Sequence, residues 1–274
     1  MPTQGPRLKN RRGSVEPAAE SDAAFARSLL IHEDAHVLAF DKPSGLAVQG
    51  GSGVKESLED MLGAFAKSNG KRPRLVHRLD RETSGVIVAA RTKPAAAALS
   101  AAFAERLAKK TYLAIVCGGA PVPDAGMIDL PLRKASRAGL DVMEIGAARQ
   151  SSTGSDRRSP ALVEGKRQGN WQDARTGYKT LAATTEAALL ELAPETGRMH
   201  QIRAHLAAIG RPIAGDGKYG GLFSLGGVSV PRLMLHASRL EAPHPAGGAL
   251  SLEAPPPEAF RLFLSALGLR QGDR

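Results

Sequence analysis

Apolar positions along the chain form two kinds of pattern, short continuous runs and residues spaced three or four apart. The continuous runs predict strands over residues 36–40, 85–90, 111–119 and 233–243, and the apolar run over 188–194 indicates ordered chain. The spaced residues predict amphipathic helices over residues 58–70, 92–107, 199–210 and 256–268. Residues 125–145 are predicted to be short extended pieces. No GxGxxG or GxxxxGK motif follows a strand, so the sequence does not support a nucleotide-cofactor fold.

Capping residues support two of these helices. Thr92 is a suitable N-cap, and Pro94 falls in the first turn, where its missing N–H does no harm. Gly210 closes the helix over residues 199–210. The helix that begins near residue 58 is expected to stop near Gly70.

Two segments have the composition of unstructured chain. Residues 1–24 are polar and basic, and predict a disordered arm ahead of one domain over residues 25–274. Residues 146–170 are rich in Ser and Gly and show no periodicity, which predicts a flexible basic insertion within that domain. The basic residues of these segments are Arg7, Lys9, Arg11, Arg12, Arg149, Arg157, Arg158, Lys166 and Arg167.

The charge of the chain narrows the class of partner. It carries 37 Lys and Arg against 27 Asp and Glu, a formal net charge of +10, which favours polyanionic partners and nucleic acid first. No apolar run approaches the roughly 20 residues of a membrane helix, and no apolar stretch follows the basic residues near the N-terminus, so we do not expect these residues to act as a secretory signal. With Cys117 as its single cysteine, the chain forms no internal disulfide, and we expect a cytoplasmic protein.

The segment His77-Arg-Leu-Asp-Arg-Glu-Thr-Ser-Gly85 has the most unusual local composition. Most of its side chains are ionisable or hydroxylic, and Gly85 permits a tight turn. Its aspartate, Asp80, is flanked by arginines, and if it is partly buried it must be paired. A solvated charged turn is the alternative. Because the segment leads into an apolar strand, its polar groups are expected at the lip of a sheet, where ligands commonly bind.

Two further segments hold candidate residues. In the helix over 199–210, Arg203 lies beside the apolar stripe and is either a surface cation or the partner of a buried carboxylate. His200 and His205 are five residues apart, which does not fit the HExxH spacing and argues against a metal site. Tyr112 follows two lysines, so it is either a stacking platform for a base or an edge-strand aromatic.

Together these segments resemble the RluA-type pseudouridine synthases. HRLDRETSG is similar to the central motif of that family. LIHEDAHVLAFDKPSGLAVQGGSG resembles its opening strand and turn, KTYLAIV its tyrosine motif and TGRMHQIRAHLAAIGRPIAGDGKYG its late helix motif. LMLHASRL and the helix after it are similar to the closing segment. The motifs follow the order of the family over residues 29–268, and GGSG points to the RluC-like branch.

The resemblance implies roles for individual residues. Asp80 is implied as the nucleophile, which either attacks the sugar or abstracts its proton. Tyr112 is implied to pack against the target base and to assist proton removal, and Arg203 to pair with Asp80. Ile202 is implied to contact the uracil, and Arg78 to fill the space that the flipped nucleotide leaves. In the same motif, His77 and Arg81 are implied to bind substrate.

The resemblance also implies a fold, a substrate and an absence of cofactors. The expected fold is α+β, with a central mixed, largely antiparallel sheet flanked by helices and a catalytic cleft across it. The expected substrate is RNA, with ribosomal RNA of the large subunit favoured and tRNA as an alternative, and the reaction needs neither metal nor organic cofactor. We expect a monomer. Roughly 30 residues precede the first strand, fewer than the about 40 that a domain needs unaided, so we expect the S4-like domain of many relatives to be absent.

Two other functions remain to be weighed. A binding module that has lost its chemistry is disfavoured because Asp80, Tyr112 and Arg203 are all present. A hydrolase that uses Asp80 and Glu82 is disfavoured because the tight turn directs Glu82 to solvent and because a nuclease would need clustered carboxylates for metal. The sequence therefore favours an RNA pseudouridine synthase.

A first prediction concerns the basic arm and insertion, which are expected to contact RNA in place of the absent domain. Deleting residues 1–24 and shortening 146–170 should weaken RNA binding and flatten its log–log salt dependence by roughly 0.7–0.9 per lost phosphate contact. The single-turnover rate at saturating RNA should stay unchanged, because the catalytic residues lie outside both segments. Binding across a salt series, beside tritium release from C5-labelled uridine, tests this. If the trimmed protein keeps the RNA affinity and the salt slope of the full-length protein, neither segment contacts RNA.

Overall fold

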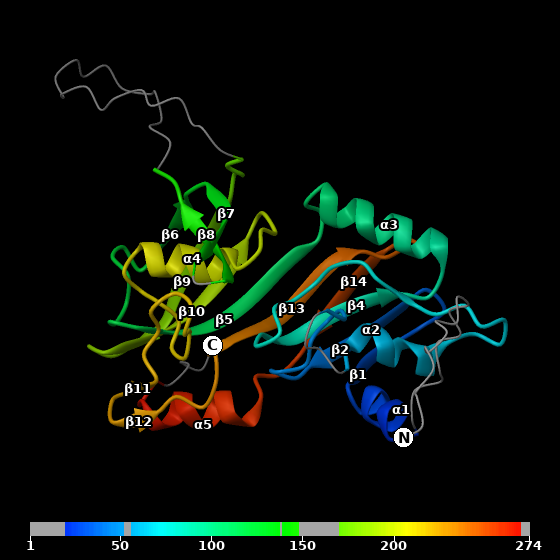
Figure 1. Ribbon diagram of the computed structural model, residues 1–274, viewed down its shortest axis with the longest axis horizontal. Helices are drawn as coiled ribbons and strands as arrows, with labels where there is room; N and C mark the ends of the chain where they lie inside the picture. Colours follow the sequence, from blue (N-terminus) through cyan, green and yellow to red (C-terminus); the bar gives the residue numbers. More distant parts are fainter. Residues whose placement is uncertain (1–19, 52–55, 138, 148–169, 270–274) are drawn as a thin grey trace, which may run out of the picture.

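A ten-stranded sheet forms the core of the computed structural model, which describes residues 20–51, 56–137, 139–147 and 170–269 (Figure 1). The main path of the sheet runs in the order β1 (Leu30–Glu33), β2 (Val37–Lys42), β4 (Ser84–Ala90), β13 (Leu235–Pro243), β5 (Lys109–Cys117), β10 (Ala187–Pro194), β9 (Arg175–Ala183) and β6 (Ala125–Asp129). Outside this path, β14 (Ala249–Glu253) pairs with β13, and β3 (Arg74–Leu75) pairs with β4. Within the described chain, β4 and β13 pair in parallel and all other strand pairs of this sheet are antiparallel. The predicted mixed, largely antiparallel sheet is confirmed.

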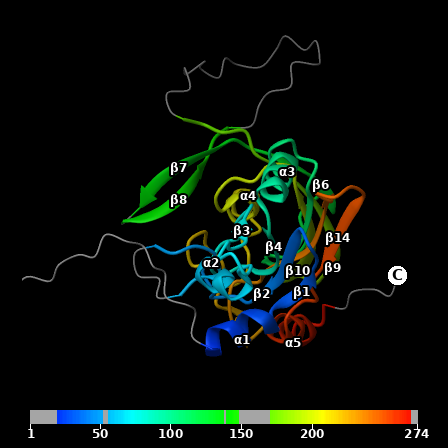
Figure 2. The same ribbon diagram turned by 90° about the vertical axis from the view of Figure 1, so that its right-hand side faces the viewer.

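Helices and two hairpins surround this sheet. The helical elements are α1 (Glu20–Ser28), α2 (Leu58–Met61), the 3-10 turn η1 (Leu62–Phe65), α3 (Lys93–Ala104), α4 (Gln201–Ala208) and α5 (Glu258–Ala266). The hairpins are β7 (Leu132–Arg137) with β8 (Leu140–Ile145), and β11 (Ser224–Leu225) with β12 (Val228–Ser229). Figure 2 shows the β7–β8 hairpin standing away from the sheet, beside α4. Met143 of β8 and Ala204 of α4 belong to one buried apolar cluster.

Strand β4 is buried along its whole length because helices cover both of its faces. Val86 and Val88 belong to the cluster that includes the buried face of α3, whereas Ile87 and Ala89 belong to the cluster formed with α1, α2 and η1. This alternation follows the two-residue period of a strand. A strand buried on both faces is a continuous apolar run, which is why GVIVAA could be predicted from the sequence.

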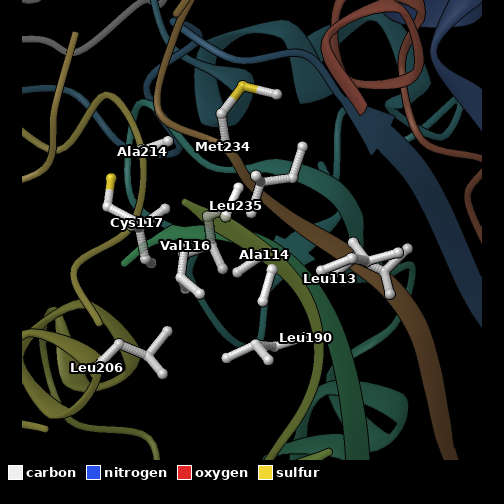
Figure 3. Close-up of a cluster of buried hydrophobic side chains, with 14 of the residues drawn as sticks. Leu113, Ala114, Val116, Cys117, Leu190, Leu206, Ala214, Met234 and Leu235 are labelled. Carbon is white, nitrogen blue, oxygen red and sulfur yellow. The ribbon is translucent and has the colours of Figure 1, made fainter. Parts of the chain in front are cut away.

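A third apolar cluster lies around β5, β10 and α4 (Figure 3). Leu113 and Val116 of β5 pack with Leu190 of β10, Leu206 of α4 and Leu235 of β13. This contact fixes α4 over the centre of the sheet. The N-terminal end of α4 is thereby held at a constant distance from the residues at the start of β5 and β4.

The parallel pairing of β4 with β13 leaves no room for a side chain at Gly85. Gly85 pairs with Ala237 at a φ of +111°, and a Cβ on Gly85 would lie 2.1 Å from the carbonyl oxygen of Ala237. Beside it, Ser84 Oγ hydrogen-bonds to the buried ring of His236 at 2.9 Å. Gly85 was predicted to permit a tight turn and to begin the strand over 85–90, and it lies within β4, one residue after the start of that strand. Its small size serves the close approach of two strands.

The helices differ from the prediction at two places. The expected arm over residues 1–24 overlaps α1, which begins at Glu20, and residues 1–19 lie outside the described residues. This helix forms because Ala26 is fully buried against the α2–η1 segment and the guanidinium of Arg27 lies 5.3 Å from the ring centroid of Phe65. Trimming of the arm should therefore stop at residue 19. Of the expected insertion over 146–170, residues 148–169 also lie outside the described residues.

The helix expected from residue 58 to Gly70 is shorter than predicted. It consists of α2 and the single turn η1, and Ala66 after it is extended. Its four apolar residues are buried within these two turns, so a longer helix would bury no further apolar side chain. The helix with Thr92 as N-cap is confirmed, because the Thr92 side chain accepts a hydrogen bond from the N–H of Ala95.

The described residues contain neither a membrane-spanning helix nor a cluster of metal-binding side chains. In the ranges that the structure describes, no helix is long and apolar enough to cross a membrane. Over the same ranges, no three side chains of the metal-binding types His, Cys, Asp or Glu gather into a group that could hold an ion.

The close approach of Gly85 to Ala237 leads to a prediction about stability. Gly85→Ala should lower the free energy of unfolding by about 3 kcal/mol or more, because it combines a strained backbone with a clash against a backbone oxygen. Gly70→Ala is the matched control: its φ is +74°, but a Cβ there would meet open space, so a loss of about 1 kcal/mol is expected. Urea unfolding measures both variants. Equal losses would show that backbone conformation alone requires Gly85.

Candidate active site

A cavity of ≈ 540 Å³ lies between the start of β4, the start of β5 and the N-terminal end of α4. This volume is within the usual range for small-ligand sites. The sequence-predicted residues that line it are His77, Arg78, Asp80, Tyr112, Ile202 and Arg203. Residues far apart in the chain thus meet in one place. The sequence analysis expected a catalytic cleft across the sheet, and this cavity fits that expectation.

Asp80 and Arg203 form an ion pair within a larger group of charges. Arg203 Nη1 donates to Asp80 Oδ2 at 3.3 Å, and the other side of the same guanidinium binds Asp216 through two hydrogen bonds of 2.7 Å each. The side chains of Arg203 and Asp216 are 4% and 0% exposed, and that of Asp80 is 22% exposed. Burial lowers the pKa of Arg203, but the hydrogen bonds and charges of Asp216 and Asp80 outweigh it and raise the pKa above its usual value. Arg203 is therefore a permanent cation beside a partly open carboxylate.

The loop that carries Asp80 is held from behind by the turn after β2. The buried ammonium of Lys42 donates to three backbone carbonyls, those of Pro43 and Arg81 at 3.0 Å and that of Leu46 at 2.8 Å. Burial lowers the pKa of Lys42 to about 7, against the carboxylates of Asp80 and Glu82, which raise it. The loop also closes on itself, because the Thr83 N–H donates to the Asp80 carbonyl at 3.1 Å. The backbone at Asp80 is thus fixed before any ligand arrives.

Arg81 does not line the cavity, although the sequence analysis placed it with substrate. Its Nε donates to the carbonyl of Gly45 at 2.9 Å, and the Gly45 N–H donates back to the Arg81 carbonyl at 2.8 Å. This exchange ties the loop that carries Asp80 to the turn after β2, so Arg81 stabilises the backbone of that loop. Glu82 is exposed, as expected.

Tyr112 lies on β5, between Leu192 of β10 and Ala237 of β13. Burial and the nearby charge of Asp80 raise the pKa of Tyr112 well above its usual value. The phenol therefore stays protonated at neutral pH, which suits packing against a ring and disfavours a phenolate base. Ile202, 7% exposed, adds an apolar surface from α4.

His77 lies in the wall of the cavity, but both its ring face and one ring nitrogen are already engaged. Its Nε2 accepts a hydrogen bond from the Val88 N–H at 3.0 Å, and its ring stacks on Phe103 with centroids 4.5 Å apart. Burial, with a smaller effect from the charge of Lys110, lowers the pKa of His77 to about 3. His77 is therefore a neutral side chain that shapes the wall. Arg78, next to it, is exposed at the cavity.

The histidines of the late helix motif have different environments. His205 is fully buried, with its ring nitrogens 2.9 Å from the carbonyl oxygen of Leu130 and from Thr176 Oγ1. His200 instead faces the cavity, where its Nε2 lies 3.9 Å from Asp80 Oδ2 and its Nδ1 lies 3.0 Å from the hydroxyl of Tyr219. Of the two, only His200 is close to the carboxylate of Asp80.

Comparisons with known proteins agree with this geometry. Residues 36–208 match the family described as RNA pseudouridylate synthase. The chain is 34% identical over 264 residues to the ribosomal large subunit pseudouridine synthase D of Nitrosomonas europaea, covering 93% of this chain and 70% of that protein. It is 36% identical over 219 residues to the mitochondrial RNA pseudouridine synthase 4 of Arabidopsis thaliana, covering 74% of this chain. The solved structure of human RNA pseudouridylate synthase domain containing 4 superposes with a TM-score of 0.72 at 30% identity, over 92% of this chain and 99% of that one.

The chain belongs to the RNA pseudouridylate synthase family. The resemblance that its motifs indicated is thereby confirmed. The chain spans 43% of the length of the Arabidopsis protein, so it shares with that relative only part of a longer polypeptide. The matched range includes all the predicted site residues, from His77 to Arg203.

Positive charge dominates the cavity of this synthase-family chain. The lining includes five basic residues, against the carboxylates of Asp80 and Glu195, and the five are Arg78, Arg106, Lys110, Arg198 and Arg203. Glu195 is in turn paired with Arg175 at 2.9 Å. A cavity of this charge suits a phosphate-bearing ligand.

Sequence reasoning missed three residues of the site, namely Asp216, Tyr219 and the cavity role of His200. Asp216 and Tyr219 belong to GDGKYGG, which was predicted only as a turn. The signal that was present is an acidic and an aromatic residue in a glycine-rich turn directly after a helix that carries an arginine. Asp216 Oδ1 accepts the N–H groups of Lys218 and Tyr219 at 3.0 and 3.2 Å, so one carboxylate both binds Arg203 and shapes the turn that presents Tyr219.

The buried ion pair gives a prediction for Arg203→Met. The variant should lose about 3–5 kcal/mol of unfolding free energy, because Asp216 would stay buried without its cation. Arg239→Met is the matched control: Arg239 binds Glu253 at 2.7 Å, but both side chains are half exposed or more, so a loss of at most about 1 kcal/mol is expected. Urea denaturation compares the two variants. A stable Arg203→Met protein would rule out an essential role for this pair in the fold.

Proposed function

We propose that the protein isomerises uridine to pseudouridine in RNA, with Asp80 as the nucleophilic or proton-abstracting carboxylate. The observation that carries the proposal is the ion pair of Asp80 with the buried Arg203, at the wall of a basic cavity in a chain of this family. Arg203 places a permanent positive charge 3.3 Å from Asp80 Oδ2. The carboxylate is thus paired with a cation and still open to the cavity, with its side chain 22% exposed.

The reaction makes few chemical demands on the protein. The bond between uracil N1 and ribose C1′ breaks, the base turns, and C5 forms a bond with C1′. The C5 proton is lost to solvent and N1 gains a proton, so atoms and electrons balance without an oxidant, a reductant or a metal. One ionised carboxylate, a pocket that retains the detached base and the exclusion of water are sufficient. Asp80 supplies the carboxylate, and the phenol ring of Tyr112 and the side chain of Ile202 supply apolar surfaces for the base.

A uridine within structured RNA must leave its stack to enter the cavity, at a cost of a few kcal/mol. Phosphate contacts of the basic lining offset this cost. Arg78 is exposed at the cavity, next to the loop that holds Asp80, and we infer that it enters the helix of the RNA where the flipped nucleotide was. Arg106 and Arg198, which were not predicted, add cations at the cavity.

The favoured RNA target is ribosomal RNA of the large subunit, and tRNA is the alternative. The first is supported by the Nitrosomonas relative, whose name assigns it to the large ribosomal subunit. We place the protein in the cytoplasm on the basis of its single cysteine and propose that it acts as a monomer. The Arabidopsis relative is named as mitochondrial, so the comparisons do not fix the compartment.

Asp80→Asn tests the proposal. The substitution keeps the size of the side chain but removes its charge, so tritium release from C5-labelled uridine in RNA should vanish. RNA affinity should persist, because it comes from cationic contacts. Turnover by the variant above a few per cent of wild type would refute the role of Asp80.

Glu82→Gln is the matched control for this experiment. Glu82 lies in the same loop, two residues from Asp80, but its side chain is exposed and is not part of the cavity. The variant should release tritium at the wild-type rate. Binding without release in the wild-type protein would instead favour an idle RNA-binding module.

A further inference from the structure

We propose that His200 is a positioning residue for Asp80, held by Tyr219 so that its Nε2–H faces the carboxylate. The inference deepens the proposed function and rests on it. Two distances define the arrangement: 3.9 Å from His200 Nε2 to Asp80 Oδ2, and 3.0 Å from His200 Nδ1 to the Tyr219 hydroxyl. The His200 side chain is 9% exposed, so its ring is held by protein on most sides.

The hydrogen bonds around Tyr219 determine which ring nitrogen of His200 carries the proton. The N–H of Met143, on β8, donates to the Tyr219 oxygen at 2.7 Å. The hydroxyl of Tyr219 is then left to donate its own proton to His200 Nδ1. Since a neutral imidazole has one N–H, that proton must be on Nε2, which is the nitrogen that faces Asp80.

The surroundings of His200 keep its ring neutral. Burial lowers the pKa of His200, and this effect outweighs the opposing attraction of Asp80. The titratable or charged side chains that face the ring or act on it are Asp80, Asp141, Arg203, Asp216, Lys218 and Tyr219. The carboxylates raise the pKa of His200, whereas Arg203 and Lys218 lower it. The position of the proton on the neutral ring is set by the hydrogen bond from Tyr219. The same ring of Tyr219 lies 5.4 Å from the guanidinium of Arg203, which couples the two partners of Asp80.

Both partners approach the same oxygen of Asp80. Arg203 Nη1 and His200 Nε2 face Oδ2, and within the described chain no hydrogen bond to Oδ1 is present. Oδ1 is therefore the oxygen that remains for the substrate. A separation of 3.9 Å is longer than a hydrogen bond, but such contacts commonly tighten when substrate binds. Once shortened, the Nε2–H would hold the carboxylate plane in place while Oδ1 reacts.

The backbone of His200 allows substitutions that separate this role from folding. His200 has a φ of 50° in the left-handed region, which Asn tolerates well. His200→Asn should therefore fold normally, but its short side chain does not extend to Asp80. His200→Gln carries an amide N–H at about the reach of Nε2 and is the conservative variant. Tyr219→Phe keeps His200 and removes the hydroxyl that orients it.

The kinetic experiment measures single-turnover tritium release at saturating RNA, beside RNA affinity and thermal melting. His200→Asn and Tyr219→Phe should slow release by roughly 10- to 100-fold, as is typical when a partner that orients a reacting group is lost, with RNA affinity unchanged. His200→Gln should recover part of the rate. Tyr178→Phe is the control, because Tyr178 donates to the Pro123 carbonyl away from the cavity, and its rate should equal wild type. Wild-type rates in all variants, or equal rates for Asn and Gln, would overturn the proposal.

A second measurement needs no activity and so separates this inference from the proposed function. In the full-length protein with nitrogen-15 histidine, the His200 signals are assigned by their loss in His200→Asn. Their chemical shifts near neutral pH should report a neutral ring with the proton on Nε2, and Tyr219→Phe should shift the ring toward the other tautomer. A proton on Nδ1, or a charged ring, in the wild-type protein would refute the arrangement even if the enzyme is active. Absence of tritium release from wild type would refute the proposed function and leave the tautomer result standing.

Discussion

The guanidinium of Arg203, held between the carboxylates of Asp216 and Asp80, is the interaction on which the site depends. Asp216 takes two short hydrogen bonds and is fully buried, whereas Asp80 takes one longer bond and is partly open. The hydrogen bonds to Asp216 hold the Arg203 guanidinium in place. The longer bond to Asp80 brings the positive charge of Arg203 next to a carboxylate that is still accessible. Buried ion pairs are weak evidence for stability in general. Here the geometry gives the pair a function, because one anchored cation serves a second, reactive anion.

The reactive carboxylate is also fixed through its backbone, by groups that never touch the cavity. Lys42 donates hydrogen bonds to three backbone carbonyls of the surrounding turns. Arg81 and Gly45 exchange two further hydrogen bonds between the loop of Asp80 and the turn after β2. On the far side of the loop, Ser84 is bound to the buried ring of His236. A catalytic group gains most when it is held in place before the substrate binds. The polar residues of the opening motif therefore serve the position of Asp80.

Features that depend on residues close together in the sequence could be predicted. Strand β4 and helix α3 were predictable because a continuous apolar run and an N-cap are local signals. The pairing of Arg203 with Asp80 came from the family resemblance, since 123 residues separate the two. Asp216 and Tyr219 were read only as parts of a turn, because their roles depend on contacts with α4 and β8 that no local pattern encodes. For the same reason Arg81 was expected at the substrate, although its Nε is bound to the turn after β2.

The order of strands has a consequence for how the polypeptide acquires its site during synthesis. Strand β13 lies between β4 and β5, yet it follows β5 by more than a hundred residues in the chain. Until the ribosome has released β13, the strands next to Asp80 and Tyr112 have no shared neighbour in the sheet. Contacts of such long sequence separation form late and slowly. A nascent chain is surrounded by RNA while it emerges from the ribosome, and with the proposed activity this topology would delay assembly of the site until almost all of the domain has been made.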